Sequence, residues 1–381
     1  MKNLLPATDW EDVFLEKPLT FKEFLETSPN FLKMAYKTTI DFFNSIDDSM
    51  NVTEYYFQGC LGSGKSIMIY TLLAYKLYLF CLLKDAHQVL GHSPMVKYTF
   101  GILGSKKTAP LVLSSILNVF EYFPMFKQNR FELDEGPIGF SVNCNNAILR
   151  LQYITSGGRR GTPIQIISVS NQADLMGSTL IGLLGTDLIA FMQDTGISEE
   201  DLFKLIEKSK HRINTRLGED CFLGTLLIEK EPYDTELSVI DKYIMEIENR
   251  GYPSVRVVRI TPFWKVRPEG YTLDNTKKIP YFNLSKLCVE YDISNPDLSA
   301  IHIRIPTELI KNAMDNPEAF MRDYIGLPTS MIPNERMQVL RDIHSKMREY
   351  NIKISLGPNG SFYLEDIMGN KEYIQDTFRS F

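Results

Sequence analysis

Residues 59 to 66 place two glycines, a lysine and a serine at fixed spacing between two stretches of different character. The pattern is Gly-x-x-x-x-Gly-Lys-Ser, made of Gly59, Cys60, Leu61, Gly62, Ser63, Gly64, Lys65 and Ser66. A short aromatic and β-branched run, Val52 to Phe57, precedes it, and a long apolar stretch begins at Ile67. The order is therefore strand, loop and helix.

This order gives the motif a physical meaning. Glycines in such a loop let backbone N–H groups surround phosphates, the lysine reaches the outer phosphates, and the serine hydroxyl ligates Mg²⁺. The N-terminus of the following helix adds a dipole that favours an anion. We therefore predict a loop that binds ATP and Mg²⁺, rather than a glycine-rich turn without a ligand, with Lys65 as a catalytic residue and Ser66 as a metal ligand.

Strand-like runs recur along the chain, with helical patterns between several of them. They span Val52 to Phe57, Val96 to Leu103, Ala147 to Ile154, Pro163 to Ser168, Leu188 to Met192, Thr225 to Ile228 and Val255 to Thr261. This alternation predicts an α/β fold, a P-loop NTPase with a mainly parallel central sheet flanked by helices. We expect an N-terminal helical segment over residues 1–50, the ATPase core over 51–262, and a C-terminal α+β subdomain over 263–381.

Two helical regions are marked by their end signals. Pro18 and Pro29 divide the N-terminal segment into short helices. Glu199 to Arg216 forms a long helical pattern, and Ser198 with Asp201 three residues later is typical of its start.

Composition limits the remaining possibilities. The chain has 381 residues, of which 44% are hydrophobic, so it can bury a large core. Its five cysteines are scattered, which favours reduced thiols over disulfides or a zinc site. The net charge of -6 gives no general attraction to nucleic acid. The N-terminus lacks the pattern of a secretory signal, and the apolar stretch Ile67 to Leu83 contains Lys76 and is shorter than a membrane span, so we expect a cytoplasmic protein without a membrane partner.

A P-loop enzyme also needs an acidic side chain at the end of a buried strand to hold Mg²⁺. Asp194 follows the apolar run Leu188 to Met192 and is our first candidate, with Asp187 as the lesser one. A glutamate that orients the attacking water would usually come next, but Thr195 stands there.

Other carboxylates could replace that glutamate. Glu199 and Glu200 lie in the first turn of a helix, where the helix dipole alone explains them. Glu229 and Glu231 follow the run that ends at Ile228, and could face either the nucleotide or the solvent.

Arginines are the candidates for stabilising the charge that develops on the transferred phosphoryl group, in cis or from a neighbouring subunit. Arg159 and Arg160 lie in a glycine-rich loop that suits an arginine finger, a DNA contact or an ordinary exposed turn equally well. Arg212 and Arg216 lie at the basic end of the long helix, where a solvated surface is the simpler interpretation.

The order of these features resembles the ATPase domain of the large terminase subunit, the DNA-packaging motor of tailed bacteriophages. The resemblance covers roughly residues 50 to 330 and is carried by the P-loop, the segment ending at Asp194, the basic helix Lys210 to Arg216, Gly224 to Ile228, Thr261 to Lys265, Ile303 to Pro306 and Ala319 to Gly326. The chain departs from the family at Thr195, where a glutamate is usual, and at Glu229 and Lys230, where serine or threonine is usual.

The resemblance implies a ring of subunits that hydrolyse ATP, dock on a portal protein and drive double-stranded DNA into a procapsid in the host cytoplasm, together with a small terminase subunit. Residues Leu356 to Phe381 lack the acidic pattern of the family's nuclease, so we do not expect this chain to cut DNA. The two departures leave a second possibility, a nucleotide-binding structural component that has lost hydrolysis. A helicase-like ATPase is less favoured, because no Asp-Glu-x-x box is recognisable at the end of a predicted strand and no second recombinase-like lobe is recognisable either.

Overall fold

The structure of the chain is a computed structural model. The structure describes residues 10–46, 52–60, 62–105, 107–127, 139–145, 148–155, 158–175, 178–218, 221, 223–230, 239–260, 262–268, 271, 273, 279–284, 286–291, 302–327, 353–356, 362–365 and 371–373. The chain divides into two compact units. The first contains residues 1–58, 64–231 and 238–260, and the second contains residues 59–63, 232–237 and 261–381.

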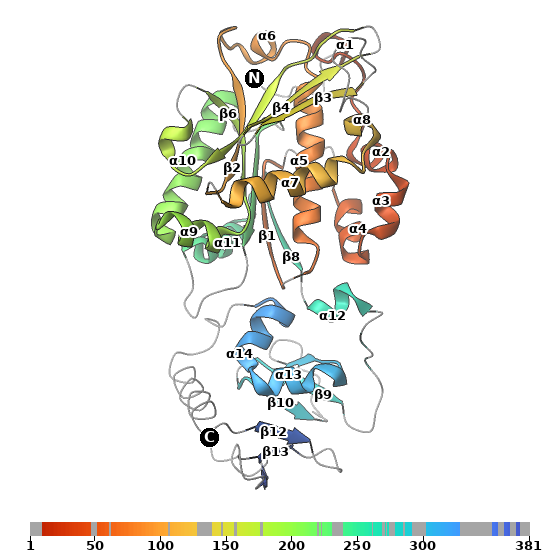
Figure 1. Cartoon of the computed structure of the whole chain (residues 1–381), viewed down its shortest axis with the longest axis vertical. Helices are drawn as coiled ribbons and strands as arrows, with labels where there is room; N and C mark the ends of the chain where they lie inside the picture. Colours follow the sequence, from red (N-terminus) through yellow and green to blue (C-terminus); the bar gives the residue numbers. More distant parts are fainter. Residues whose placement is uncertain are drawn as a thin grey trace. The chain divides into compact units, whose positions relative to one another are not determined.

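An eight-stranded sheet forms the centre of the first unit, in the order β3-β4-β5-β2-β6-β7-β1-β8 (Figure 1). The strands are β1 (Glu54–Gly59), β2 (Tyr98–Leu103), β3 (Gly139–Asn145), β4 (Ile148–Ile154), β5 (Ile164–Val169), β6 (Thr179–Gly185), β7 (Thr225–Lys230) and β8 (Val255–Ile260). The pairs β2/β5, β2/β6, β6/β7 and β7/β1 are parallel, whereas β4 runs antiparallel to β3 and β5. The predicted α/β fold with a mainly parallel sheet is confirmed.

The central strands β2, β6 and β7 are buried along their whole length, because helices cover both faces of the sheet. The helix α5 (Lys65–Cys81) packs against β7 and β4, with α4 (Lys37–Asn44) and α7 (Thr108–Phe120) beside it. The predicted long helix is α10 (Glu199–Leu217), which packs on β6 and contacts α11 (Val239–Arg250). In Figure 1, α5 and α10 lie on opposite sides of the sheet. Among the described residues, none of the helices combines the length and apolar character that crossing a membrane requires.

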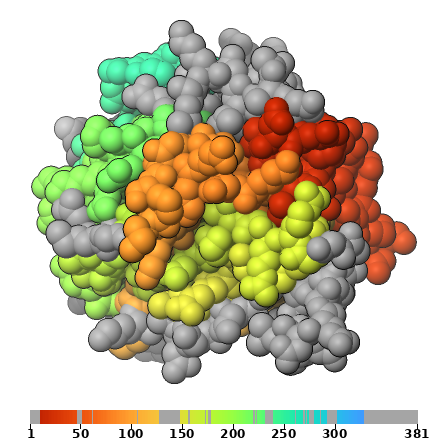
Figure 2. Space-filling model, turned by 90° about the horizontal axis from the view of Figure 1, so that it is seen from above, coloured from red at the N-terminus to blue at the C-terminus, as the bar shows by residue number. Residues whose placement is uncertain are grey.

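The N-terminal helices pack on the first unit through aromatic side chains. They are α1 (Trp10–Val13), α2 (Phe21–Glu26), α3 (Pro29–Met34) and α4. Thr20 and Glu23 form a capping box at the start of α2, and the ring of Phe24 stacks on Phe123 at 4.5 Å. Backbone hydrogen bonds from Leu15 to Leu82 and from Lys84 to Val13 join this N-terminal segment to the end of α5. In Figure 2 the red N-terminal segment and the orange segment that follows it lie side by side.

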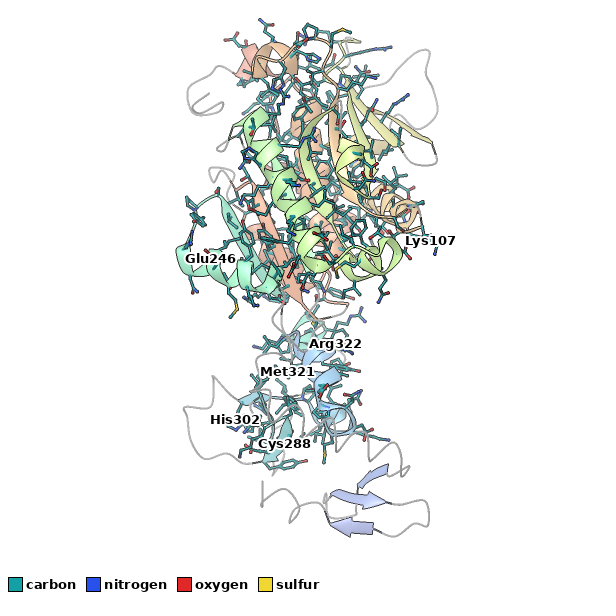
Figure 3. All side chains as sticks on the ribbon, turned by 90° about the vertical axis from the view of Figure 1, so that its left-hand side faces the viewer. Lys107, Glu246, Cys288, His302, Met321 and Arg322 are labelled. Carbon is teal, nitrogen blue, oxygen red and sulfur yellow. The ribbon has the colours of Figure 1, made fainter. Side chains whose placement is uncertain are left out.

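The second unit has its own apolar core. Strands β9 (Pro280–Asn283), β10 (Cys288–Tyr291) and β11 (His302–Arg304) form an antiparallel sheet in the order β10-β9-β11, next to α13 (Ile310–Asp315) and α14 (Pro317–Phe320). Met321 is completely buried, whereas Arg322 pairs with Asp323 at 2.6 Å (Figure 3). A further antiparallel sheet contains β12 (Lys353–Leu356), β13 (Phe362–Glu365) and β14 (Lys371–Tyr373).

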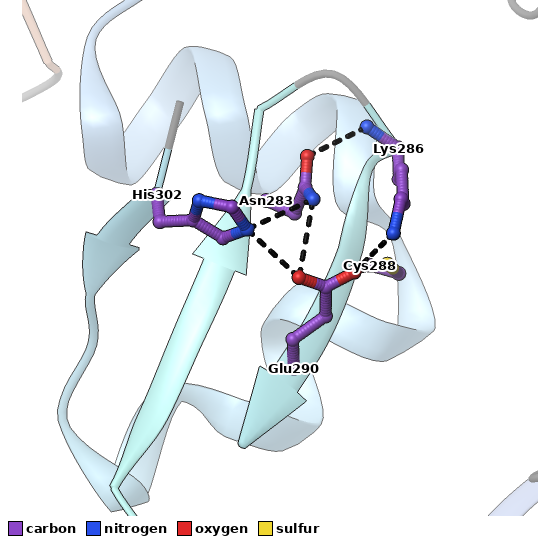
Figure 4. Close-up of polar contacts among 5 residues, drawn as sticks. All are labelled: Asn283, Lys286, Cys288, Glu290 and His302. Carbon is purple, nitrogen blue, oxygen red and sulfur yellow. Dashed lines mark hydrogen bonds and ion pairs between the residues drawn. The ribbon is translucent and has the colours of Figure 1, made fainter. Parts of the chain in front are cut away.

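A polar cluster joins the three strands β9, β10 and β11 (Figure 4). Glu290 accepts hydrogen bonds from Lys286 at 2.8 Å and Asn283 at 3.2 Å, and lies 2.8 Å from His302. Burial acts to raise the pKa of Glu290, but these partners outweigh it and lower that pKa. Burial, with the charge of Glu290, raises the pKa of Cys288 to about 11. A thiol with a raised pKa is a poor nucleophile, and the hydrogen bonds of the cluster connect the three strands.

The prediction of a strand at Leu188 to Met192 is wrong. That segment begins the helix α9 (Leu188–Thr195), and the buried strand before it is β6. Gly182 in β6 explains the error, because a Cβ there would lie 2.3 Å from the Phe100 ring and 2.7 Å from the carbonyl oxygen of Thr225. Tight packing therefore requires glycine in a strand, although glycine weakens the sequence signal for one. The other six predicted strands are present within a few residues of the expected bounds.

A buried ion pair connects α10 to β1. Lys210 lies 2.9 Å from Glu54 and donates a hydrogen bond to Tyr243 at 2.8 Å. Glu54 is 5% exposed, and burial raises its pKa even with Lys210 beside it. The pair therefore offsets a desolvation cost at the start of the P-loop strand.

We predict that Lys210→Ala lowers the free energy of unfolding by about 3 kcal/mol, because it leaves Glu54 buried without its cation. A raised carboxyl pKa means that the folded state binds a proton more tightly than the unfolded state, so the loss should shrink as pH falls from 7 toward 5. Urea unfolding at both pH values measures this. Lys204→Ala, which removes an exposed pair with Asp201, is the control and should change stability by less than about 1 kcal/mol. An equal loss in both variants at pH 7 would refute the prediction.

Candidate nucleotide-binding site

The P-loop has the backbone conformation that its glycines predict. Gly62 and Gly64 have φ angles of 67° and 84°, in the left-handed region that favours glycine. Gly64 precedes α5, so the N-terminus of a 17-residue helix lies directly behind the loop. Ser63 is 1% exposed, and its hydroxyl has no hydrogen-bond partner among the described residues. An orphaned donor beside a helix N-terminus suits an anion such as a phosphate. Leu61 lies outside the described residues.

The N-terminal helix α4 packs against the loop. A Cβ on Gly64 would lie 3.0 Å from the Thr39 hydroxyl oxygen and 3.3 Å from the Tyr36 ring. Thr39 is 1% exposed, and its hydroxyl also has no hydrogen-bond partner within the described part of the chain. The N-terminal segment therefore contributes to the wall of the candidate site.

Lys65 and Ser66, the first two residues of α5, meet the same carboxylate. The Lys65 ammonium lies 3.6 Å from one oxygen of Glu229, and the Ser66 hydroxyl donates to the other oxygen at 3.3 Å. Lys65 is 3% and Glu229 is 7% exposed. Of the two orientations left open by the sequence, Glu229 thus faces the P-loop and not the solvent, while Glu231 lies outside the described residues.

A second carboxylate lies near this group. Tyr70 is on α5, one turn after Ser66, and burial raises its pKa, with further contributions from the negative charges of Glu229 and Asp187. Asp187 directly follows Thr186 at the end of β6 and is exposed. Since β6 and β7 are parallel neighbours, Asp187 and Glu229 are at the same edge of the sheet as the P-loop. Asp187, our lesser candidate from sequence, therefore takes the position expected for the acidic residue after a buried strand.

Asp194 lies elsewhere. It is in the last turn of α9, where it accepts a hydrogen bond from Ser105 at 2.7 Å and lies 3.9 Å from Lys107, whose side chain points outward in Figure 3. Ser105 follows β2, and β6 and β7 separate β2 from β1. The Ser66 hydroxyl contacts Glu229 on β7, which is two strand spacings or about 10 Å from β2, so Asp194 does not lie beside Ser66 as a shared metal ion would require.

Arg159 and Arg160 are at the other end of α5 from Lys65. Arg159 donates a hydrogen bond to the Leu15 carbonyl oxygen at 3.2 Å, and Arg160 pairs with Ile154 in a β-bridge. A Cβ on the next residue, Gly161, would meet the carbonyl oxygen of Cys81, the last residue of α5. Because α5 is about 24 Å long, neither arginine reaches the P-loop of its own chain.

Arg212 and Arg216 are also distant from the P-loop. The Arg216 carbonyl oxygen lies 3.0 Å from His92, which in turn bonds Tyr98 at the start of β2. The end of α10 is therefore at the edge where the parallel strands begin, whereas the P-loop is at the edge where they end. Glu199, at the opposite end of α10, lies 3.8 Å from Lys230 on β7. A cation for the transferred phosphoryl group would have to come from a residue other than these four arginines, or from a second subunit.

These positions define what the candidate site can do. The loop backbone, Lys65 and the orphaned hydroxyls suit the phosphates of a nucleotide, and Ser66 with Asp187 or Glu229 suits Mg²⁺, which prefers oxygen ligands. Glu229 is the residue that sequence reasoning undervalued. The signal was present, since a carboxylate directly follows the four apolar and β-branched residues Thr225 to Ile228.

We predict that Gly64→Ala weakens ATP binding at least about tenfold, because its Cβ would press against Thr39 and Tyr36 and displace them from the wall of the site. Gly196→Ala is the matched control, since Gly196 also has a positive φ of 70° but has nothing within 4 Å of its Cβ position. Both variants carry a backbone strain of about 1–2 kcal/mol. Titration with a fluorescent ATP analogue should therefore separate them, and equal affinities would contradict this account of the loop.

Comparison with known proteins gave matches to solved structures alone. Neither the protein-family models nor the curated proteins include a match. The ATPase domain of the Thermus phage P74-26 large terminase is 14% identical, with a TM-score of 0.40 over 67% of this chain and 89% of that one. An arginine-to-alanine mutant of the same domain is 13% identical, with a TM-score of 0.42 over 67% and 90%.

The large terminase of bacteriophage HK97 is 14% identical, with a TM-score of 0.34 over 76% of this chain and 50% of that one. Identities and TM-scores this low transfer no residue role from those proteins to this chain. All three of these solved structures are phage large terminases or their ATPase domains.

Proposed function

We propose that this chain hydrolyses ATP at the P-loop. The observation that carries the proposal is the group of Lys65, Ser66 and Glu229, in which a buried lysine and a half-buried hydroxyl at a helix N-terminus face a buried carboxylate on a strand of the sheet. Lys65 would bind the outer phosphates, and Ser66 and Asp187 would hold Mg²⁺. When bound, Mg²⁺ neutralises charge on the phosphates and orients them.

We further propose that hydrolysis drives the packaging of viral DNA. This part rests on the ordered sequence features that resemble the large terminase subunit. The partners would be double-stranded DNA, a portal protein and a small terminase subunit, in the cytoplasm of the host. Arg159, Arg160 and Arg212 are too far from the P-loop of their own chain to act there. In a ring of subunits, a neighbouring subunit would supply the cation in trans.

A second candidate function is a nucleotide-binding component of the same machinery that does not hydrolyse ATP. Leu188 directly follows Asp187, so the position next to the acidic residue that follows β6 carries no second carboxylate. Such a component would bind ATP tightly but release phosphate no faster than buffer.

We predict that Lys65→Ala and Asp187→Asn each lower DNA-stimulated phosphate release by about 100-fold or more, because each removes a charge that acts on the phosphates or their metal ion. Asp194→Asn and Lys107→Ala should keep turnover near the wild-type rate, since Asp194 and Lys107 lie beside β2 and not beside the P-loop. Steady-state phosphate release by the purified chain with double-stranded DNA provides the measurement. Equal turnover in the wild type and Lys65→Ala would refute hydrolysis at this site.

A further inference from the structure

We infer that Glu229, on β7, is the carboxylate that orients the attacking water, and that Lys65 and Ser66 hold it until a nucleotide binds. The inference rests on the proposed ATP hydrolysis. It names the residue that orients the attacking water, which the proposed function does not assign. A glutamate for this task would normally follow the acidic residue of β6, where Leu188 stands. The geometry instead places a glutamate on the strand between β6 and β1.

Glu229 has the position that this task requires. Phe57 on β1 is its partner in the sheet register, so it lies two residues before the point where β1 enters the P-loop at Gly59. Both of its oxygens are directed at the first turn of α5, one toward Lys65 and one toward Ser66. Lysine and serine at these positions are the groups that bind the outer phosphates and Mg²⁺. A nucleotide held by them would bring its terminal phosphate next to Glu229.

The same contacts indicate an exchange of partners. Lys65 is almost fully buried, and a buried ammonium needs an anion nearby. Glu229 is one such anion, and the phosphate oxygens of a bound nucleotide would be another. The carboxylate would then be released from Lys65 and Ser66 while it stays in a protected position. Nucleotide binding would thus free the group that hydrolysis requires, so the carboxylate acts only when a substrate is in place.

Asp187 is less suited to the same task. It is exposed, and its backbone has a left-handed φ of 49° at the start of α9. Its side chain is also one methylene shorter, and it extends from a strand one position farther from β1. These features favour a role at the metal ion, which leaves Glu229 as the carboxylate nearest to the position of the terminal phosphate.

The reaction balances without any further reactant. The Glu229 carboxylate accepts a hydrogen bond from a water molecule, whose oxygen attacks the terminal phosphorus of ATP. A new P–O bond forms, and the bond from phosphorus to the bridging oxygen breaks, with its electron pair leaving on ADP. The water proton passes to Glu229 and then to solvent or phosphate, so the products are ADP and inorganic phosphate.

The test compares Glu229→Gln with Glu199→Gln. Glutamine keeps the size and polarity of the side chain but cannot accept the proton, so we expect turnover to fall by about 100-fold or more. Binding of a fluorescent ATP analogue should not weaken, because a negative charge near the phosphates has been removed. Glu199 is the matched control, because it also pairs with a buried lysine, in its case Lys230 on β7, and Glu199→Gln should turn over ATP like the wild type.

A second variant separates this role from a structural one. Glu229→Asp keeps the anion that Lys65 needs for folding but withdraws the carboxylate by about 1.5 Å, which should also cost about 100-fold in turnover while ATP still binds. Near-wild-type turnover in Glu229→Gln would overturn the inference, as would loss of ATP binding in both Glu229 variants, since Glu229 would then only shape the site. If the wild type binds ATP but releases no phosphate, the proposed hydrolysis itself fails.

Discussion

A lysine and a glutamate that are both almost inaccessible to solvent face each other where α5 begins and β7 ends. Placing two charges in a protein interior is costly unless they are paired, so the contact between Lys65 and Glu229 offsets part of the cost of burying each of them. The pairing holds the first turn of α5 against the sheet and points a cation toward the phosphate loop. Binding of an anion would replace one partner of this pair, which makes the site responsive to its ligand.

The parallel sheet brings the members of this site together. Its strands β6, β7 and β1 are neighbours and end at one edge, so residues far apart in the sequence, such as Lys65, Asp187 and Glu229, approach one another there. The opposite edge of the sheet carries a stabilising ion pair. There Lys210 and Glu54 join α10 to the start of β1, and so hold the strand that carries the P-loop. Buried charged pairs thus lie near both ends of β1.

Much of this arrangement could be predicted from local patterns. The Gly-x-x-x-x-Gly-Lys-Ser spacing between a strand and a helix identified the loop, and apolar runs identified six strands. The run Leu188 to Met192 was wrongly predicted as a strand, because a short apolar segment is compatible with a helix or a strand. In addition, Gly182 weakened the sequence signal of the strand that is present, β6. Asp194 was consequently preferred to Asp187. The contacts of Glu229 and the distant positions of Arg159 and Arg212 depend on strand order, which no local pattern contains.

The central claim is that Lys65 exchanges Glu229 for phosphate when a nucleotide binds. The most direct measurement is an experimental structure of the chain with Mg²⁺ and an ATP analogue that cannot be hydrolysed. The account predicts that Lys65 contacts the outer phosphates, that its distance from Glu229 increases beyond the present 3.6 Å, and that a water molecule lies between Glu229 and the terminal phosphate. A bound nucleotide with Lys65 and Ser66 still paired to Glu229 would contradict the account.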